Sequence, residues 1–149
     1  MRPSRTRLPH EIPYWVKDGA LYFISINCID RGRNILCHDF VARGIYESLE
    51  FRHHHNEWWI RNFVLMPDHC HGIISFSRHV EMRKSIFNWK RYTARQLGFR
   101  WQRDFFDHRI RDTHSLEEKE HYLTMNRVRK QLCASASDWP YLWNAANFE

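Results

Sequence analysis

The chain has 149 residues, of which 43% are hydrophobic and 27% are charged, and only five are glycine and five proline. This length allows one domain and excludes a second core of full size, while the composition excludes collagen-like, low-complexity and disordered chains. Lysine and arginine outnumber aspartate and glutamate by 23 to 17, which gives a formal net charge of +6 and favours a polyanionic partner.

Four strands are predicted along the chain. Residues 1–17 are basic and contain three prolines, so we expect an irregular lead-in to a single domain over residues 18–149. After this lead-in, segments rich in β-branched and aromatic residues predict strands over residues 20–29, 58–66, 70–76 and within 101–110.

Three helices are predicted between and after these strands. Apolar residues at three- and four-residue spacings predict helices over residues 38–54 and 80–97, the second closed by Gly98. A capping box at Ser115–Glu118 predicts a third helix that runs to about Cys133. The order β-α-β-β-α-β with an added C-terminal helix predicts an α+β, ferredoxin-like sandwich, in which an antiparallel sheet carries helices on one face.

Apolar runs and cysteine spacing indicate the cellular compartment of the protein. No apolar run approaches the roughly eighteen residues that cross a bilayer, and the first residues lack the apolar stretch of a secretory signal. We therefore expect a cytoplasmic protein with no membrane contact. The cysteines are far apart in the sequence, which favours reduced thiols over disulfides or a cysteine-rich zinc site, at Cys28, Cys37, Cys70 and Cys133.

The most informative motif is a pair of histidines separated by one residue in a predicted strand. Successive strand side chains alternate between the two faces, so His69 and His71 would point the same way while Cys70 points into the core. Two such imidazoles can share one metal ion. The alternative is a pair of half-exposed histidines at the rim of a strand.

A second candidate cluster lies on the third predicted helix. Tyr122 and Asn126 are four residues apart and leave the same helix face. Such a polar stripe is typical of a solvated helix face. If the sandwich brings the stripe to His69 and His71, two imidazoles and an amide oxygen surround a divalent ion beside a phenol. This combination suits attack on a phosphodiester.

These motifs fall in the order of a known family. Residues 63–74 (FVLMPDHCHGII) resemble the His-hydrophobic-His signature of the single-tyrosine HUH transposases. Three further segments resemble the REP-associated tyrosine transposase branch of that family. They are residues 101–108 (WQRDFFDH) with Ile110-Arg111, residues 121–126 (HYLTMN) and residues 138–140 (DWP). The ordered set extends from about Ala20 to Trp143 and is more specific than any one motif.

The resemblance implies a role for each candidate residue. It implies that His69 and His71 are metal ligands, that Tyr122 on the added helix is the catalytic nucleophile, and that Asn126 is a candidate third ligand. It implies cleavage of single-stranded DNA beside short hairpins through a 5′-phosphotyrosine, with Mg²⁺ or Mn²⁺ and without ATP.

A basic segment over residues 83–103 is predicted to bind the DNA. It holds no acidic residue, and its cations can neutralise phosphates. Ile86 and Trp89 within it fall at core-facing helical spacings. The predicted DNA-binding residues are Arg83, Lys84, Lys90, Arg91, Arg95, Arg100 and Arg103.

Other functions stay open on the residues alone. A catalytically silent, domesticated protein that binds DNA hairpins would share the basic segment and the fold. A zinc hydrolase that acts on a small molecule would need a further protein ligand and a base that activates water. The sequence also leaves open whether the protein is a monomer or a homodimer, and whether it uses Mg²⁺ or Mn²⁺.

Overall fold

One antiparallel sheet organises the part of the chain that the structure describes. The structure is a computed structural model, and it describes residues 12–129 and 139–149, without the side chains of residues 126–129. The spatial order of the strands is β4-β1-β3-β2-β5. Their bounds are Leu21–Asn27 for β1, Trp58–Met66 for β2, His69–Phe76 for β3, Phe106–Ile110 for β4 and Leu142–Asn144 for β5.

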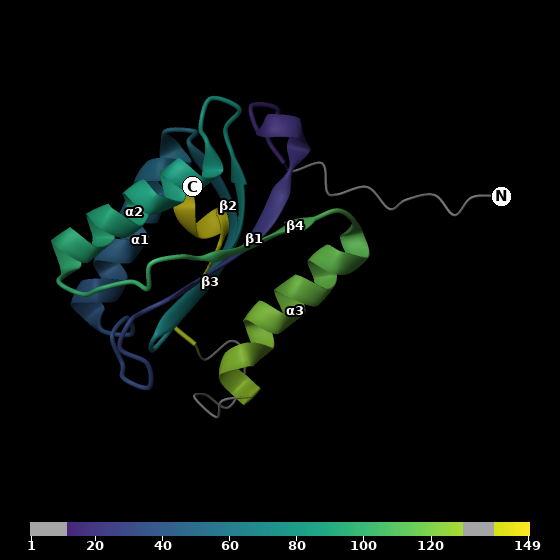
Figure 1. Cartoon of the computed structure of the whole chain (residues 1–149). Coiled ribbons are helices and arrows are strands. Elements are labelled where there is room, and N and C mark those ends of the chain that lie inside the picture. The colour runs from purple at the N-terminus through teal and green to yellow at the C-terminus, as the bar shows by residue number, and fades with distance from the viewer. Residues whose placement is uncertain (1–11, 130–138) are drawn as a thin grey trace.

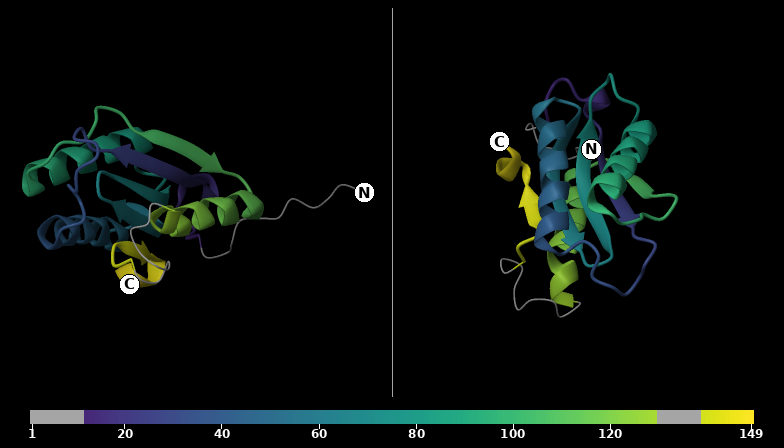
Figure 2. Two further views of the ribbon diagram at one scale, coloured as in Figure 1. Left: turned by 90° about the horizontal axis from the view of Figure 1, so that it is seen from below. Right: turned by 90° about the vertical axis from the view of Figure 1, so that its left-hand side faces the viewer.

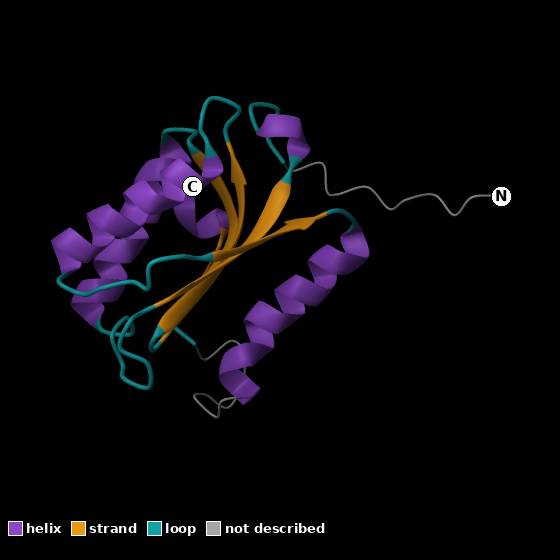
Figure 3. Ribbon diagram, in the orientation of Figure 1, coloured by secondary structure: helices purple, strands orange, loops and turns teal. Residues whose placement is uncertain are grey.

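Helices cover both faces of this sheet. Helices α1 (Asp39–His54) and α2 (Met82–Leu97) pack on one face, and α3 (Thr113–Arg129) lies on the other (Figures 1 and 3). Figure 2 shows the same layers from two further sides. Short 3₁₀ helices, η1 (Lys17–Gly19) and η3 (Ala145–Phe148), complete the described elements. The strand order and the layers confirm the predicted α+β, ferredoxin-like sandwich with an added C-terminal helix.

Two apolar cores form, one on each side of the sheet. Ile45, Leu49 and Trp89 belong to the core beneath α1 and α2, whereas Leu116 and Leu123 of α3 pack into the second core on the opposite face. The burial of Trp89 confirms the interpretation of this ring as a core residue. Because α3 contributes its leucines to the second core, the rest of the helix is held close to the sheet face beneath it.

The central strand β3 is buried along its whole length. Its side chains alternate, so Cys70 joins the core beneath α1 and α2, as predicted, and Ile73 joins the core beneath α3. Gly72 makes room for the ring of Phe63, since a Cβ atom at Gly72 would lie 2.7 Å from Phe63 Cδ2. The same alternation directs His69 and His71 toward α3.

The predicted C-terminal end of α2 is confirmed, whereas the predicted start of α3 is not. Gly98 caps α2 with a φ of 76°, a conformation that glycine adopts without strain, as predicted. Helix α3 begins earlier than predicted, because the carboxylate of Asp112 accepts a hydrogen bond from the Ser115 N–H at 2.7 Å. The predicted cap at Ser115 is therefore wrong, and the predicted extension of this helix to Cys133 lies outside the described residues.

Two smaller findings concern the thiols and the membrane. Cys28, Cys37 and Cys70 form no disulfide in the described part of the chain. Burial raises the pKa of Cys28 and of Cys37 to about 12, so both thiols stay protonated at neutral pH. Cys133 lies outside the described residues.

Within the described ranges, no helix has both the length and the apolar character needed to span a bilayer.

Candidate active site

The histidine pair lies at the start of β3, directly after the tight turn that joins it to β2. His69 pairs with Met66 across this hairpin, and Pro67 and Asp68 form the turn between them. The residues His69 and His71 are each only 5% exposed. Their ring centroids are 4.9 Å apart and the rings are nearly perpendicular. The two imidazoles are therefore close enough for one ion to bind both.

A carboxylate orients the first imidazole. Asp68 Oδ1 lies 2.7 Å from His69 Nδ1, and Asp68 Oδ2 accepts a hydrogen bond from the Gly32 N–H at 2.8 Å. An ionised carboxylate can only accept, so Nδ1 of His69 is the donor. This hydrogen bond favours the tautomer with its lone pair on Nε2, the nitrogen that a metal ion would bind.

The charge of Asp68 is itself stabilised. Burial acts to raise the pKa of this carboxyl, but hydrogen bonds from Gly32 and His69 and the charge of Arg31 outweigh burial and hold the pKa below its ordinary value. The Arg31 Nε atom lies 3.3 Å from Asp68 Oδ2. The loop after β1 therefore keeps Asp68 ionised and in place beside the imidazole.

Tyr122 of α3 meets the second imidazole. The centroids of the Tyr122 and His71 rings are 5.5 Å apart, in an edge-to-face arrangement. Phe23 of β1 stacks on His71 at 5.4 Å and meets the Tyr122 ring at 6.0 Å. Tyr122 is 39% exposed, so its phenol remains accessible from outside the fold. The structure thus brings together His69, His71 and Tyr122.

The third predicted metal ligand is placed only by its backbone. Asn126 lies in α3 one turn beyond Tyr122, and its side chain lies outside the described residues. Among the residues that are described, no three His, Cys, Asp or Glu side chains form a group that could hold a metal ion. An amide oxygen is one ligand type that a divalent ion at His69 and His71 could accept beside the two imidazoles.

Comparison with known proteins decides the family. The family model described as "Transposase IS200 like" matches residues 20–126, which include both histidines and Tyr122. The chain belongs to the IS200-like transposase family. The indicated resemblance to REP-associated tyrosine transposases is also confirmed, because curated relatives carry that name.

Two such relatives come from bacteria. A Haemophilus influenzae protein assigned as a REP-associated tyrosine transposase is 27% identical over 143 residues, covering 83% of this chain and 78% of the relative. The REP-associated tyrosine transposase of Escherichia coli is 25% identical over 138 residues, covering 86% of this chain and 78% of the relative.

Solved structures of similar proteins support the fold. The structure of a REP-associated tyrosine transposase bound to a REP hairpin matches with a TM-score of 0.74 at 21% identity, covering 91% of this chain and 82% of that one. A crystal structure from Deinococcus radiodurans, of a protein described as a transposase, matches with a TM-score of 0.51 at 15% identity, covering 88% and 98%. These likenesses extend over most of each chain.

The predicted DNA-binding residues of this IS200-like transposase lie away from the histidines. Most of them project from α2 or from the segment after it, whereas His71 faces α3 on the other side of the sheet. Only the end of the basic segment approaches the site, because the Gln102 N–H donates to the Asn27 carbonyl and Asn27 pairs with His69. The exposed members are Arg83, Lys84, Arg91, Arg95, Arg100 and Arg103.

Lys90 is the exception among these predicted residues. It is buried, and its Nζ atom donates to three backbone carbonyls, those of Gln102, Arg103 and Asp104, at 2.8, 3.0 and 3.1 Å. An ammonium group has three donors, so these carbonyls use all of them. The prediction that Lys90 binds DNA is therefore wrong, because this side chain holds the segment that leads into β4.

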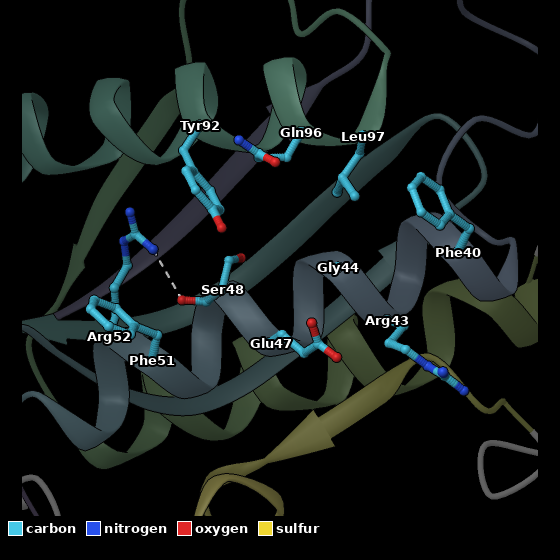
Figure 4. A pocket seen from close by; sticks show the side chains of 10 residues that line it. All are labelled: Phe40, Arg43, Gly44, Glu47, Ser48, Phe51, Arg52, Tyr92, Gln96 and Leu97. Carbon is cyan, nitrogen blue, oxygen red and sulfur yellow. Dashed lines mark hydrogen bonds between the residues drawn. The ribbon is translucent and has the colours of Figure 1, made fainter.

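A groove between α1 and α2 lies on the face opposite the histidines. It has a volume of about 670 Å³, and Phe40, Phe51, Tyr92 and Leu97 are among the apolar side chains that line it. Figure 4 shows these side chains between the two helices, with the Arg52 guanidinium donating to the Ser48 carbonyl. This groove contains none of the predicted catalytic or metal-binding residues.

Sequence reasoning missed two residues that shape the site. Asp68 orients His69, and Phe23 stacks on His71. A signal for Asp68 was present, because a carboxylate directly before a histidine pair can reach the first ring. No local signal marked Phe23, since its contact with His71 depends on the register between β1 and β3.

Proposed function

We propose that this transposase is a metal-dependent DNA transesterase that cleaves and rejoins single-stranded DNA near hairpins, with Tyr122 as the nucleophile. The observation that supports this proposal most strongly is the contact between the Tyr122 and His71 rings, whose centroids are 5.5 Å apart. A phenol on one helix and a histidine pair on a central strand meet only because α3 crosses that face of the sheet. Tyr122 is 39% exposed, so a DNA strand can reach this side chain from outside the fold.

In the proposed reaction, the Tyr122 oxygen attacks the phosphorus of the scissile phosphodiester. A bond forms between phosphorus and the phenol oxygen, the bond from phosphorus to the 3′ oxygen breaks, and the 3′ oxygen takes up a proton and leaves as a hydroxyl. The phenol proton departs to solvent as the attack proceeds. The resulting 5′-phosphotyrosine conserves the bond energy, and attack by a 3′ hydroxyl rejoins the strand without ATP.

The other site residues orient the reacting groups. His69, His71 and the Asn126 side chain are proposed to hold Mg²⁺ or Mn²⁺, which when bound supplies positive charge that polarises the scissile phosphate. Asp68 fixes the His69 ring through the 2.7 Å hydrogen bond, and Phe23 fixes His71 by stacking. The donor set fits such an ion, since two imidazoles share one face and an amide lies one turn beyond Tyr122.

Hairpin DNA is the proposed partner. The solved structure of a similar REP-associated transposase contains a REP hairpin, and the formal net charge of +6 favours a nucleic acid. The exposed cations of residues 83–103 and the exposed Arg31 and Arg33 are candidates for contacts with phosphates.

A covalent-adduct assay tests this function. The full chain is incubated with Mn²⁺ and hairpin oligonucleotides that carry unpaired flanks of randomised sequence, and a denaturing gel separates protein joined to DNA. We expect an adduct that disappears in Tyr122→Phe, while hairpin affinity stays nearly unchanged. His69→Ala and His71→Ala should also abolish the adduct.

Two other results would change the assignment. An adduct that persists in Tyr122→Phe would remove Tyr122 from its role as nucleophile. Hairpin binding by the wild-type chain without any adduct, across the randomised flanks and with either Mg²⁺ or Mn²⁺, would favour the catalytically silent hairpin-binding protein.

A further inference from the structure

Phe106 is a large apolar side chain that the core does not use. It begins the edge strand β4 and is 58% exposed. Ile110 at the other end of β4 is buried in the core beneath α3. Side chains of a strand alternate between the faces, so Phe106, His108 and Ile110 all face α3. The Phe106 ring therefore lies on the same face of the sheet as the histidine pair.

The strand register places this ring level with the reacting groups. Phe106 pairs with Ser25 of β1, and Ser25 pairs with His71 of β3. Phe106 and His71 thus stand in one row across the sheet, two strands apart, which corresponds to about 10 Å. Stacked nucleotides follow one another at about 3.4 Å along a strand. A base on Phe106 would therefore belong to a nucleotide a few positions at most from a phosphate beside His71.

A cation lies above the strand between them. Lys119 of α3 is one turn before Tyr122, and its Nζ atom is 5.0 Å from the centroid of the Phe23 ring. Phe23 is in β1, where it pairs with His108 of β4. The ammonium group therefore lies over β1, the strand that separates β4 from β3.

We propose that Phe106 and Lys119 form a subsite for the unpaired DNA strand next to the scissile phosphate, in which Phe106 stacks on a base and Lys119 neutralises a backbone phosphate. This inference rests on the proposed function, since it assigns part of the substrate to the same site. An aromatic ring beside a cation is the usual surface for unpaired nucleotides, because every base has a face that can stack. Single-stranded DNA is favoured over a protein partner because the same face of β4 carries the exposed His108, and Lys119 lies over the neighbouring strand β1.

The test compares two fluorescent hairpin probes by anisotropy with the full chain. One probe has blunt ends, and the other carries an unpaired flank of about ten nucleotides of randomised sequence, within the site sizes typical of single-strand binders. Phe106→Ala and Phe106→Leu should weaken binding of the flanked probe at least about fivefold and leave the blunt probe unchanged. Phe106→Trp should restore binding, because the aromatic face and not apolar bulk is required.

A matched control comes from the opposite face. Phe40 of α1 is 70% exposed and lines the groove between α1 and α2 (Figure 4). Phe40→Ala should bind both probes as the wild type does. Lys119→Gln should lower the salt dependence of binding to the flanked probe by about 0.7 in the slope of log K against log salt, the value for one phosphate on a single strand.

The outcomes separate this inference from the proposed function. If Phe106→Ala binds the flanked probe as tightly as the wild type while the Tyr122-dependent adduct still forms, the subsite is refuted and the nicking function stands. If no adduct forms but Phe106 still determines the affinity for the flank, the subsite stands and the nicking function fails. Equal losses for both probes would also refute the subsite, since the flank would then play no part.

Discussion

Replacing Asp68 by asparagine removes the charge that holds the imidazole of His69. In the wild type, one carboxylate oxygen accepts from His69 Nδ1 at 2.7 Å and the other accepts from the Gly32 N–H at 2.8 Å. Asparagine keeps the shape but has only one acceptor oxygen. If that oxygen stays with Gly32, the amide NH₂ faces His69 Nδ1, and the ring must carry its proton on Nε2 instead.

That change of tautomer determines the size of the expected effect. A proton on Nε2 blocks the nitrogen that would bind a metal ion. Loss of a partner that orients a metal-bound histidine typically costs 10–100-fold in metal affinity or activity, which is about 1.4–2.8 kcal/mol. We therefore expect Asp68→Asn to raise the Mn²⁺ concentration that gives half-maximal adduct about 10–100-fold.

The measurement is a Mn²⁺ titration of adduct formation with the same hairpin DNA. Asp30→Asn is the matched control, because Asp30 is an exposed carboxylate in the same loop after β1. It removes the same charge and should leave the titration unchanged. A titration of Asp68→Asn that coincides with the wild type would refute the argument that this carboxylate sets the tautomer of His69.

The same variant should change the pH dependence of stability. The folded-state pKa of Asp68 lies below the ordinary 3.8, so the unfolded chain binds more protons as the pH falls through this range. The contribution of Asp68 to stability is therefore present above pH 3.8 and is lost as the pH falls through the lowered pKa. Urea unfolding should show a gap between wild type and Asp68→Asn near neutral pH that narrows in acid; a constant gap would contradict this.

Three further substitutions test the fold around the site by urea unfolding. Asp112→Ala should lower the free energy of unfolding by about 1 kcal/mol, as expected for a lost helix cap, and Ser115→Ala should cost less; the reverse order would restore the cap predicted from sequence. Lys90→Met should lower it by about 1–3 kcal/mol because three carbonyls lose their donor, with hairpin affinity unchanged; weaker DNA binding at unchanged stability would contradict the structural role. Gly72→Ala should cost about 1–3 kcal/mol, since the new methyl group meets the Phe63 ring at 2.7 Å, and a neutral result would show that the ring can move aside.

Local sequence patterns were sufficient to predict much of the fold and the histidine pair of the site. Alternation along a strand predicted that His69 and His71 share a face while Cys70 turns to the core, and the structure agrees. Gly98 marked the end of α2 for a similar reason, because a left-handed residue at a helix end depends on its own backbone. Such features depend on only a few neighbouring residues, so a single sequence is enough to predict them.

Features that depend on contacts between distant segments could not be read in this way. Lys90 is a basic residue in the same basic segment as its exposed neighbours. In the folded chain, however, its ammonium group donates hydrogen bonds to three backbone carbonyls. The short strand β5 adds to the edge of the sheet beside β2, although no strand was predicted there from the sequence. In both cases a partner from another part of the chain determines the outcome.

The sequence by itself determined the order of the elements, the shared face of the two histidines and the motifs of the family, because each depends on the spacing of residues along the chain. Only the tertiary structure decided that α3 crosses the sheet so that Tyr122 meets His71, and that Phe106 stands in the same row as His71. The physical reason is that strand register and helix packing are set by the burial of side chains from both cores at once. No local spacing specifies that shared burial.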